Sequence, residues 1–269
     1  MTDTLKIIVT GLCLIVLTLF SPLAHAQDSS SGEGKWEFVV IPYFWLASLD
    51  GDVTVKGIKS SVSLSGSDLL DMLDYGGEVH MEAWKGRWGI FFDPTFLKLS
   101  ADGHANRPIV GRVDVDTDLQ EWLVEFGALY TLGTWPFGTD GKKLSLDVLG
   151  GGRYWYMKGK LNADVPLLGL SKRVEKSKDW IDPMVGARLR VDLAKKLSLA
   201  VRGDIGGFGV GSDFTWNASA ILGYHFSQTV SAWLGYRGLG VDYESGSGFS
   251  KFKYDVIMQG PIIGLGFSF

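Results

Sequence analysis

Residues 119–130 read LQEWLVEFGALY, and this stretch decides the fold. In an extended strand, successive side chains point to opposite faces. One face here carries large apolar side chains, among them Trp122 and Phe126, whereas the other carries the carboxylates of Glu121 and Glu125. A strand of a transmembrane β-barrel turns its apolar face to lipid and its polar face to the lumen. The alternation therefore predicts a strand that crosses a membrane.

The same alternation recurs along the chain between turns rich in Gly, Asn, Asp, Ser and Lys. Together with 119–130, the expected strands are 35–48, 76–85, 87–97, 143–157, 180–191, 196–208, 213–226, 229–241 and 251–269. After residue 26 the sequence has no run of about 18 apolar residues, which excludes membrane-spanning helices there. The predicted fold is all-β, an antiparallel up-and-down transmembrane β-barrel of about ten strands. The hairpin-like piece 51–65 is either an outer extension or two further strands, so eight or twelve strands stay open.

An even strand number places both chain ends on one side of the membrane, the periplasm. Short turns at 86–87, 195–196 and 227–228 then alternate with longer segments, apart from the short connection near 209–213. The expected outer loops are 48–74, 100–111, 163–178 and 242–250. This asymmetry is typical of bacterial barrels. Four prolines fall inside expected strands, where the missing N–H predicts bulges, namely Pro42, Pro94, Pro183 and Pro261.

Residues 1–26 have the layout of a secretory signal peptide. The apolar run 7–20 is followed by the small-residue pattern Ala24-His25-Ala26 and then by polar residues. We expect cleavage after this segment and a single barrel domain over 27–269. The one cysteine, Cys13, lies inside the segment, so the mature chain is expected to have no thiol. Such a chain suits an oxidising compartment.

The composition excludes several classes of protein. With 13% aromatic residues the chain is not of the disordered type. A formal net charge of −4 argues against a nucleic-acid partner. A single cysteine excludes zinc sites built from several thiolates.

The last residues, IIGLGFSF, alternate apolar side chains and end in phenylalanine. The pattern of Ile263, Leu265, Phe267 and Phe269 resembles the assembly signal of Gram-negative outer-membrane β-barrel proteins. The opening stretch 36–46 and the segment 85–89 resemble a family of small proteobacterial barrels. The resemblance implies the outer membrane as location, its lipid as surroundings and the barrel-assembly machinery as partner in biogenesis. It implies no activity.

Strand alternation also predicts which charged side chains line the lumen. The acidic ones lie in the first half of the chain, together with His80, and are Glu37, Glu78, Glu82, Asp93, Glu121, Glu125 and Asp147. The basic ones follow, and are Arg153, Arg188, Arg190, Arg202 and Arg237. Opposed walls of this kind either pair into a plug or face each other across water in a pore. Pairing is favoured because unpaired interior charge is costly.

Three functions follow from this lumen. The first is a narrow pore or transporter for small polar solutes through a charge-segregated lumen. The alternative is a closed structural or surface-interaction barrel with an ion-paired interior. A third, minor hypothesis is an enzyme at the outer rim. Neither the His225-Phe226-Ser227 sequence nor His104 with Asp102 completes a catalytic set, so we expect no enzyme, no catalytic residue and no cofactor. Oligomeric state and solute are left open.

Two further clusters are candidate metal sites. Glu78, His80 and Glu82 share one strand face, where a histidine satisfied by its carboxylate neighbours is the favoured interpretation. Asp68, Asp71 and Asp74 lack the spacing of a calcium loop. No metal site is predicted. The segment around Asp68 is expected to form a short helix capped by Ser67, acting either as a partial lid or as a solvated loop.

Overall fold

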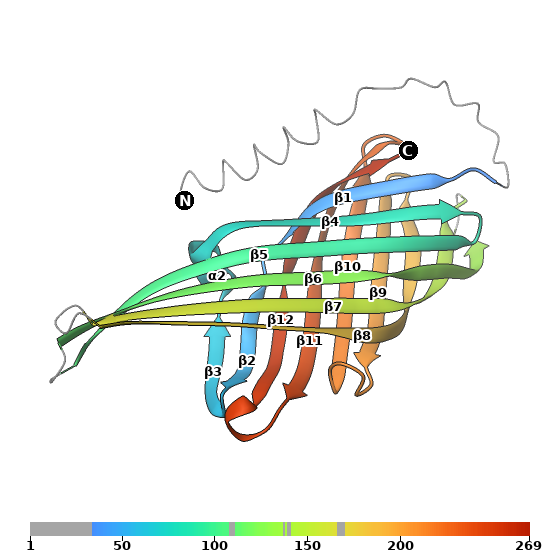
Figure 1. The fold of residues 1–269 in the computed structure, drawn as a ribbon. Coiled ribbons are helices and arrows are strands. Elements are labelled where there is room, and N and C mark those ends of the chain that lie inside the picture. Colours follow the sequence, from blue (N-terminus) through green and yellow to red (C-terminus); the bar gives the residue numbers. More distant parts are fainter. Residues whose placement is uncertain (1–33, 108–110, 137, 139–140, 166–169) are drawn as a thin grey trace. The chain divides into compact units, whose positions relative to one another are not determined.

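The computed structural model describes residues 34–107, 111–136, 138, 141–165 and 170–269. Ten antiparallel strands form a closed ring in which neighbours along the chain pair with each other, and the last strand pairs with the first (Figure 1). They are β1 (Glu37–Trp45), β4 (Leu73–Lys85), β5 (Trp88–Arg107), β6 (Gly111–Pro136), β7 (Lys143–Val165), β8 (Leu170–Ala194), β9 (Leu197–Gly207), β10 (Phe214–His225), β11 (Val230–Ser245) and β12 (Phe252–Ser268). The predicted ten-stranded up-and-down barrel is confirmed. The expected signal peptide, 1–26, lies outside the described residues.

The hairpin over 51–65 extends the wall and adds no strand to the ring. It consists of β2 (Ser48–Val55) and β3 (Ile58–Leu64). β2 continues β1 alongside β12 in the same register, with Trp45 opposite Ile262 and Ser48 opposite Gln259. β4 pairs with β1 only as far as Glu78. Beyond that level the wall divides, with β2 and β3 on one side and β4 on the other.

A short helix, α2 (Gly66–Met72), connects β3 to β4 across this division. Its N-cap is Ser65, two residues before the expected Ser67. The Ser65 hydroxyl accepts a hydrogen bond from the Asp68 N–H at 3.2 Å, and the Asp68 carboxylate accepts one from the Ser65 N–H at 2.8 Å. Two helix-end N–H groups are thereby satisfied, which Ser67 alone would not achieve. Leu69 and Leu70 are half-buried.

The outer face of the ring is apolar and bordered by aromatic side chains. Trp88 and Tyr130 have ring centroids 4.6 Å apart near one end of β5 and β6. Phe96 and Trp122 have centroids 4.5 Å apart further along the same strands. Trp88 is 62% exposed and Trp122 39%, although both are large and apolar. Two aromatic girdles around an apolar band are typical of membrane barrels, whose strands need about 9–11 residues to cross.

β5, β6, β7 and β8 are much longer than a membrane crossing, with 20, 26, 23 and 25 residues. Figure 1 shows them running together past the other strands. We call the part beyond Phe96 and Trp122 the extension (97–107, 111–121, 157–165 and 170–179). The outer loops expected at 100–111 and 163–178 were therefore wrong. Pairing continues without a shift from Leu97 opposite Glu121 to Arg107 opposite Gly111.

The bulges expected at prolines were also wrong. In the described ladders, register shifts fall at 73/75, 131/133 and 192/194, away from every proline. Pro94 pairs opposite Val124 of β6, while the ladder on its other side skips from Thr95 to Phe92. A proline removes one N–H donor, so it weakens the ladder on one edge and leaves the register intact.

Of the C-terminal residues expected to form the assembly signal, Ile263, Leu265 and Phe267 lie on β12, and Phe269 follows its end. Ile263 and Leu265 are exposed on its outward face, and Phe269 is exposed at the chain end. Among the described residues no helix is long and apolar enough to span a membrane.

Candidate functional site

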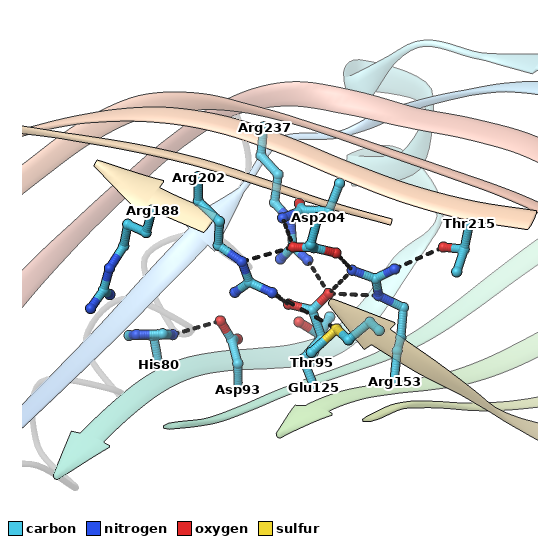
Figure 2. Close-up of polar contacts among 12 residues, drawn as sticks. His80, Asp93, Thr95, Glu125, Arg153, Arg188, Arg202, Asp204, Thr215 and Arg237 are labelled. Carbon is cyan, nitrogen blue, oxygen red and sulfur yellow. Dashed lines mark hydrogen bonds and ion pairs between the residues drawn. The ribbon is translucent and has the colours of Figure 1, made fainter. Parts of the chain in front are cut away.

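A cluster of charged side chains joins opposite walls of the barrel at mid-depth. Arg237 of β11 places Nη2 3.0 Å from Oε1 of Glu125 on β6. These two strands are five places apart in the ring of ten, so the ion pair spans the lumen. Figure 2 shows Arg153, Arg202 and Arg237 converging on Glu125 and Asp204. We call these five residues the charge cluster.

Arg153 lies at the centre of the charge cluster and has no solvent-exposed area. Its guanidinium donates from Nε to Glu125 at 2.6 Å, from Nη2 to Asp204 at 2.7 Å and from Nη1 to Thr215 at 2.8 Å. Arg202 donates from Nε to the other Asp204 oxygen at 2.8 Å. Charge-assisted bonds of this kind are the strong ones in proteins. Strong hydrogen bonds therefore connect Arg153 and Arg202 to the two carboxylates of the charge cluster.

Asn217 connects the two sides of the charge cluster. Its Nδ2 donates to Asp204 at 2.9 Å, and its Oδ1 accepts from Nε of Arg237 at 2.9 Å. An amide is both donor and acceptor, so it satisfies an anion and a cation at once.

A second group of ion pairs lies nearer the barrel end that carries the short turns, which we call the turn end. His80 places Nδ1 2.8 Å from Asp93 and Nε2 2.8 Å from Glu82. Arg188 of β8 bonds to Glu82 of β4, a further link across the lumen. Arg190 donates two hydrogen bonds to the Asp147 carboxylate, from Nε at 2.8 Å and from Nη2 at 2.9 Å. His80 is thus satisfied by carboxylate neighbours, as the sequence indicated.

On the other side of the charge cluster, toward the extension, aromatic side chains fill the lumen. Trp180 stacks on Tyr243 with ring centroids 3.9 Å apart, and Trp155 meets Tyr254 edge-on at 6.4 Å. The indole of Trp155 donates to Asp182 at 3.0 Å. Apolar neighbours complete this aromatic layer, among them Leu123, Met157, Leu239, Val241, Val256 and Met258.

Sequence reasoning missed this aromatic layer. The available signal was strand parity, because Trp155 shares its face with Arg153, and Trp180 shares its face with Arg188. The acid–base segregation is also incomplete. Asp182 and Asp204 are buried on β8 and β9, the side expected to be basic.

The remaining predicted lining residues occupy different depths. Glu37 is exposed at the turn end. Glu78 is buried and accepts a hydrogen bond from the Trp45 N–H at 2.6 Å. Glu121 is buried, and so are Glu125 and Asp147.

Between the turn end and the charge cluster lies a blind cavity of about 860 Å³, which we call the vestibule. Gly86 in the β4–β5 turn and Lys143 at the start of β7 line its opening, and Arg202, Asn217 and Arg237 line its inner end. The lumen is therefore hollow over one half and filled over the other.

Other candidate chemistry is not assembled. His225 Nε2 lies 2.9 Å from the Ser198 hydroxyl, not from Ser227, whose hydroxyl accepts from the Val230 N–H. In the described part of the chain no carboxylate contacts His225, so the His225–Ser198 pair lacks the third member of a catalytic triad. His104 has a described backbone in β5, but its side chain is outside the description. No group of three metal-binding side chains occurs among the residues that the structure describes.

No protein-family profile matches the chain, and no curated protein sequence matches it significantly. Solved structures resemble it over most of their length. OmpT, the outer membrane protease of Escherichia coli, is 8% identical, with 90% of this chain and 99% of that chain covered and a TM-score of 0.50. The fold is that of Gram-negative outer-membrane β-barrels.

Two further structures cover the chain with lower scores. Ail, the attachment invasion locus protein of Yersinia pestis, is 14% identical, with 88% of this chain and 100% of that chain covered and a TM-score of 0.36. OprG, an outer membrane protein of Pseudomonas aeruginosa, is 12% identical, with 88% and 98% covered and a TM-score of 0.33. At these identities the likeness concerns fold alone.

Proposed function

We propose that the chain is an integral outer-membrane β-barrel with a closed lumen, and that it acts through the surface of its extension. The observation that carries this proposal is the ion pair between Arg237 and Glu125, which joins opposite walls. The exported chain loses residues 1–26, is inserted by the barrel-assembly machinery through its C-terminal strand, and is surrounded by outer-membrane lipid.

Two barriers in series support a closed lumen. Opening the charge cluster would leave buried charges without partners, at a cost of about 3–5 kcal/mol for each broken pair. The aromatic layer behind it would have to move as well, and Trp180 and Tyr243 are stacked at 3.9 Å. A narrow pore for polar solutes, the first function considered from the sequence, is therefore not favoured.

The extension supports a role at the cell surface. Its outward face is polar, with the ion pair Lys158–Glu175 at 2.6 Å within it and the pair between Lys98 and Asp74 of β4 at 2.7 Å beside it. Paired strands hold these side chains in fixed positions, which a flexible loop would not do. Binding surfaces of proteins are commonly displayed by such rigid scaffolds.

Planar-bilayer conductance tests the closed lumen. The refolded protein is expected to give no unitary events above a protein-free bilayer. Its folded state is verified beforehand by its heat-modifiable migration in gels. Reproducible unitary conductance would overturn the proposal in favour of the pore.

Cysteine labelling tests the orientation. Lys176→Cys places a thiol in the extension, and Lys195→Cys places one at the β8–β9 turn, each in a mature chain expected to be free of other thiols. A membrane-impermeant maleimide applied to intact cells should label the first and spare the second. Labelling of the turn position alone would contradict surface display.

A further inference from the structure

We propose that the vestibule binds an amphiphile with one anionic group and an apolar chain, which enters from the turn end. This inference requires only the cavity and its lining, and it holds whether or not the extension has a partner. The vestibule's volume of about 860 Å³ lies within the ~300–1,000 Å³ typical of small-molecule sites.

The two sides of the vestibule differ in chemistry. The side formed by β4 to β8 carries the charged residues His80, Glu82, Asp93, Arg188 and Arg190. The side formed by β9 to β12 and β1 carries most of the apolar lining residues, among them Val39, Ile41, Ile221, Trp233 and Ile262, interspersed with polar ones such as Ser219 and His225. A small inorganic anion would leave the apolar side in contact with water. A ligand with an apolar chain and a charged head would cover both sides.

The vestibule has unused cationic hydrogen-bond donors on both of its sides. Arg190 bonds to Asp147 through Nε and Nη2, and its Nη1 donates to no described group. Arg202 likewise uses Nε for Asp204, while its Nη1 makes no bond within the described chain. The side chain of Lys143 lines the opening, and its Nζ has no partner in the described ranges.

Of the three lining carboxylates, the two deeper ones, Glu82 and Asp93, already have partners, whereas Glu37 at the opening has none among the described contacts. Glu82 accepts bonds from His80, Arg188 and the Trp84 indole, the last at 2.7 Å. Asp93 accepts from the Tyr43 hydroxyl at 2.7 Å and pairs with His80. A cationic headgroup beside Arg190 would have to displace the bonds of Glu82 and Asp93, whereas an anion there would add new ones. The sign of the expected headgroup follows from this difference.

Arg190 is the best-placed headgroup contact. Its side chain is 42% exposed, compared with 12% for Arg188 and 13% for Arg202. Its guanidinium lies 4.9 Å from the Trp84 ring centroid. The Asp147 bonds and this cation–π contact hold the guanidinium in place before a ligand arrives, which reduces the entropy lost on binding.

Quenching of tryptophan fluorescence by 6-bromohexanoate tests the proposal, because Trp84 and Trp233 line the vestibule from its two sides. The full-length mature barrel is placed in nanodiscs of zwitterionic lipid. We expect saturable quenching, weakened about tenfold by Arg190→Gln, the size of effect for one charge-assisted bond. The matched control Arg173→Gln, on the extension, should leave the Kd unchanged. 6-Bromohexanol should bind at least about tenfold more weakly than the acid.

A second variant separates loss of the site from loss of the fold. Ala200→Trp fills the apolar side and should abolish saturable quenching, while heat-modifiable migration reports that the barrel is intact. Linear quenching that is equal in the unmodified protein and both variants would overturn the proposal. So would equal binding of the acid and the alcohol, or tighter binding of 6-bromohexylamine.

A further arm identifies the source of the ligand. Nanodiscs containing phosphatidylglycerol with brominated acyl chains replace the soluble probe. If Arg190→Gln weakens the quenching by the brominated lipid, the vestibule ligand is a membrane lipid. If the substitution leaves this quenching unchanged, the ligand is a water-soluble amphiphile.

Discussion

Trp155 and Tyr254 meet edge-on with ring centroids 6.4 Å apart, although β7 and β12 are five places apart in the ring of ten strands. Two aromatic side chains therefore span a lumen of this size. The interior of a barrel widens with strand number, and small barrels are filled by their own side chains. This barrel follows that rule over one half of its depth only.

The aromatic layer should dominate stability on its side of the barrel. Trp155→Ala is expected to lower the free energy of unfolding by about 3–5 kcal/mol, because it leaves a large cavity. Urea unfolding of the refolded protein in detergent measures this. Trp88→Ala, on the outward face, is the control and should cost clearly less. Equal losses for the two variants would contradict a packed interior.

The charge cluster depends on Glu125, which is shared by three arginines. Glu125→Gln removes the anion opposite Arg237 and should destabilise the barrel by about 3–5 kcal/mol in the same unfolding assay. Glu121→Gln is the matched control, since Glu121 is buried on the same strand and makes no ion pair within the described residues. The Glu125→Gln, Arg237→Gln double variant should lose less than the sum of the single losses. Strict additivity would argue against a direct pair.

The helix cap at Ser65 makes a local prediction. Ser65→Ala should lower the protection of α2 amides from hydrogen exchange by about 1 kcal/mol, because the Asp68 N–H loses its acceptor. The Leu69 N–H, which donates to the Ser65 carbonyl at 3.1 Å, is a suitable reporter. Ser67→Ala should have a much smaller effect. The reverse order would restore Ser67 as the cap.

The ion pair between Asp74 and Lys98 lies outside the membrane-spanning part of the barrel. It predicts that the stability of the folded state depends on pH. Hydrogen bonds from Lys98 and then from Ser100 hold the pKa of Asp74 below its ordinary value of 3.8. A carboxyl whose folded pKa is depressed stabilises the folded state above its unfolded pKa, and this contribution is lost as the pH falls through the folded value.

NMR titration of the Asp74 carboxyl in Lys98→Met should show the pKa moving back toward 3.8, incompletely because Ser100 remains. Lys160→Met, further along the extension, should leave the Asp74 pKa where it is. An unchanged pKa in Lys98→Met would show that the ion pair does not form.

The inward direction of the charged side chains could be predicted from the sequence, because the lipid-facing side of a membrane-crossing strand excludes charge. Glu125, Arg153 and Arg237 point inward as the alternation predicted. Which of them meet could not be predicted, since pairing across the lumen depends on strand tilt and stagger. Glu125 shows the difference, because its inward direction was predicted from the sequence and its three arginine partners were not.

Strand ends were harder to predict than strand faces. Charged residues such as Asp116 and Lys176 have the composition of loops, yet they lie in paired strands of the extension. Backbone hydrogen bonds can continue a sheet into water wherever both neighbours continue as well. A prediction made for one strand at a time does not consider its neighbours, so it cannot place the ends of such strands.

From Val39 to Val55 the N-terminal part of the chain follows β12 in a single register. The β2–β3 hairpin consequently shields the main chain of Phe252–Gln259, which would otherwise be a bare edge. Bare edges recruit strands from other molecules. A shortened protein without residues 48–64 would thus expose the backbone of β12 in place of the short, polar strand β3, which forms the edge of the described sheet.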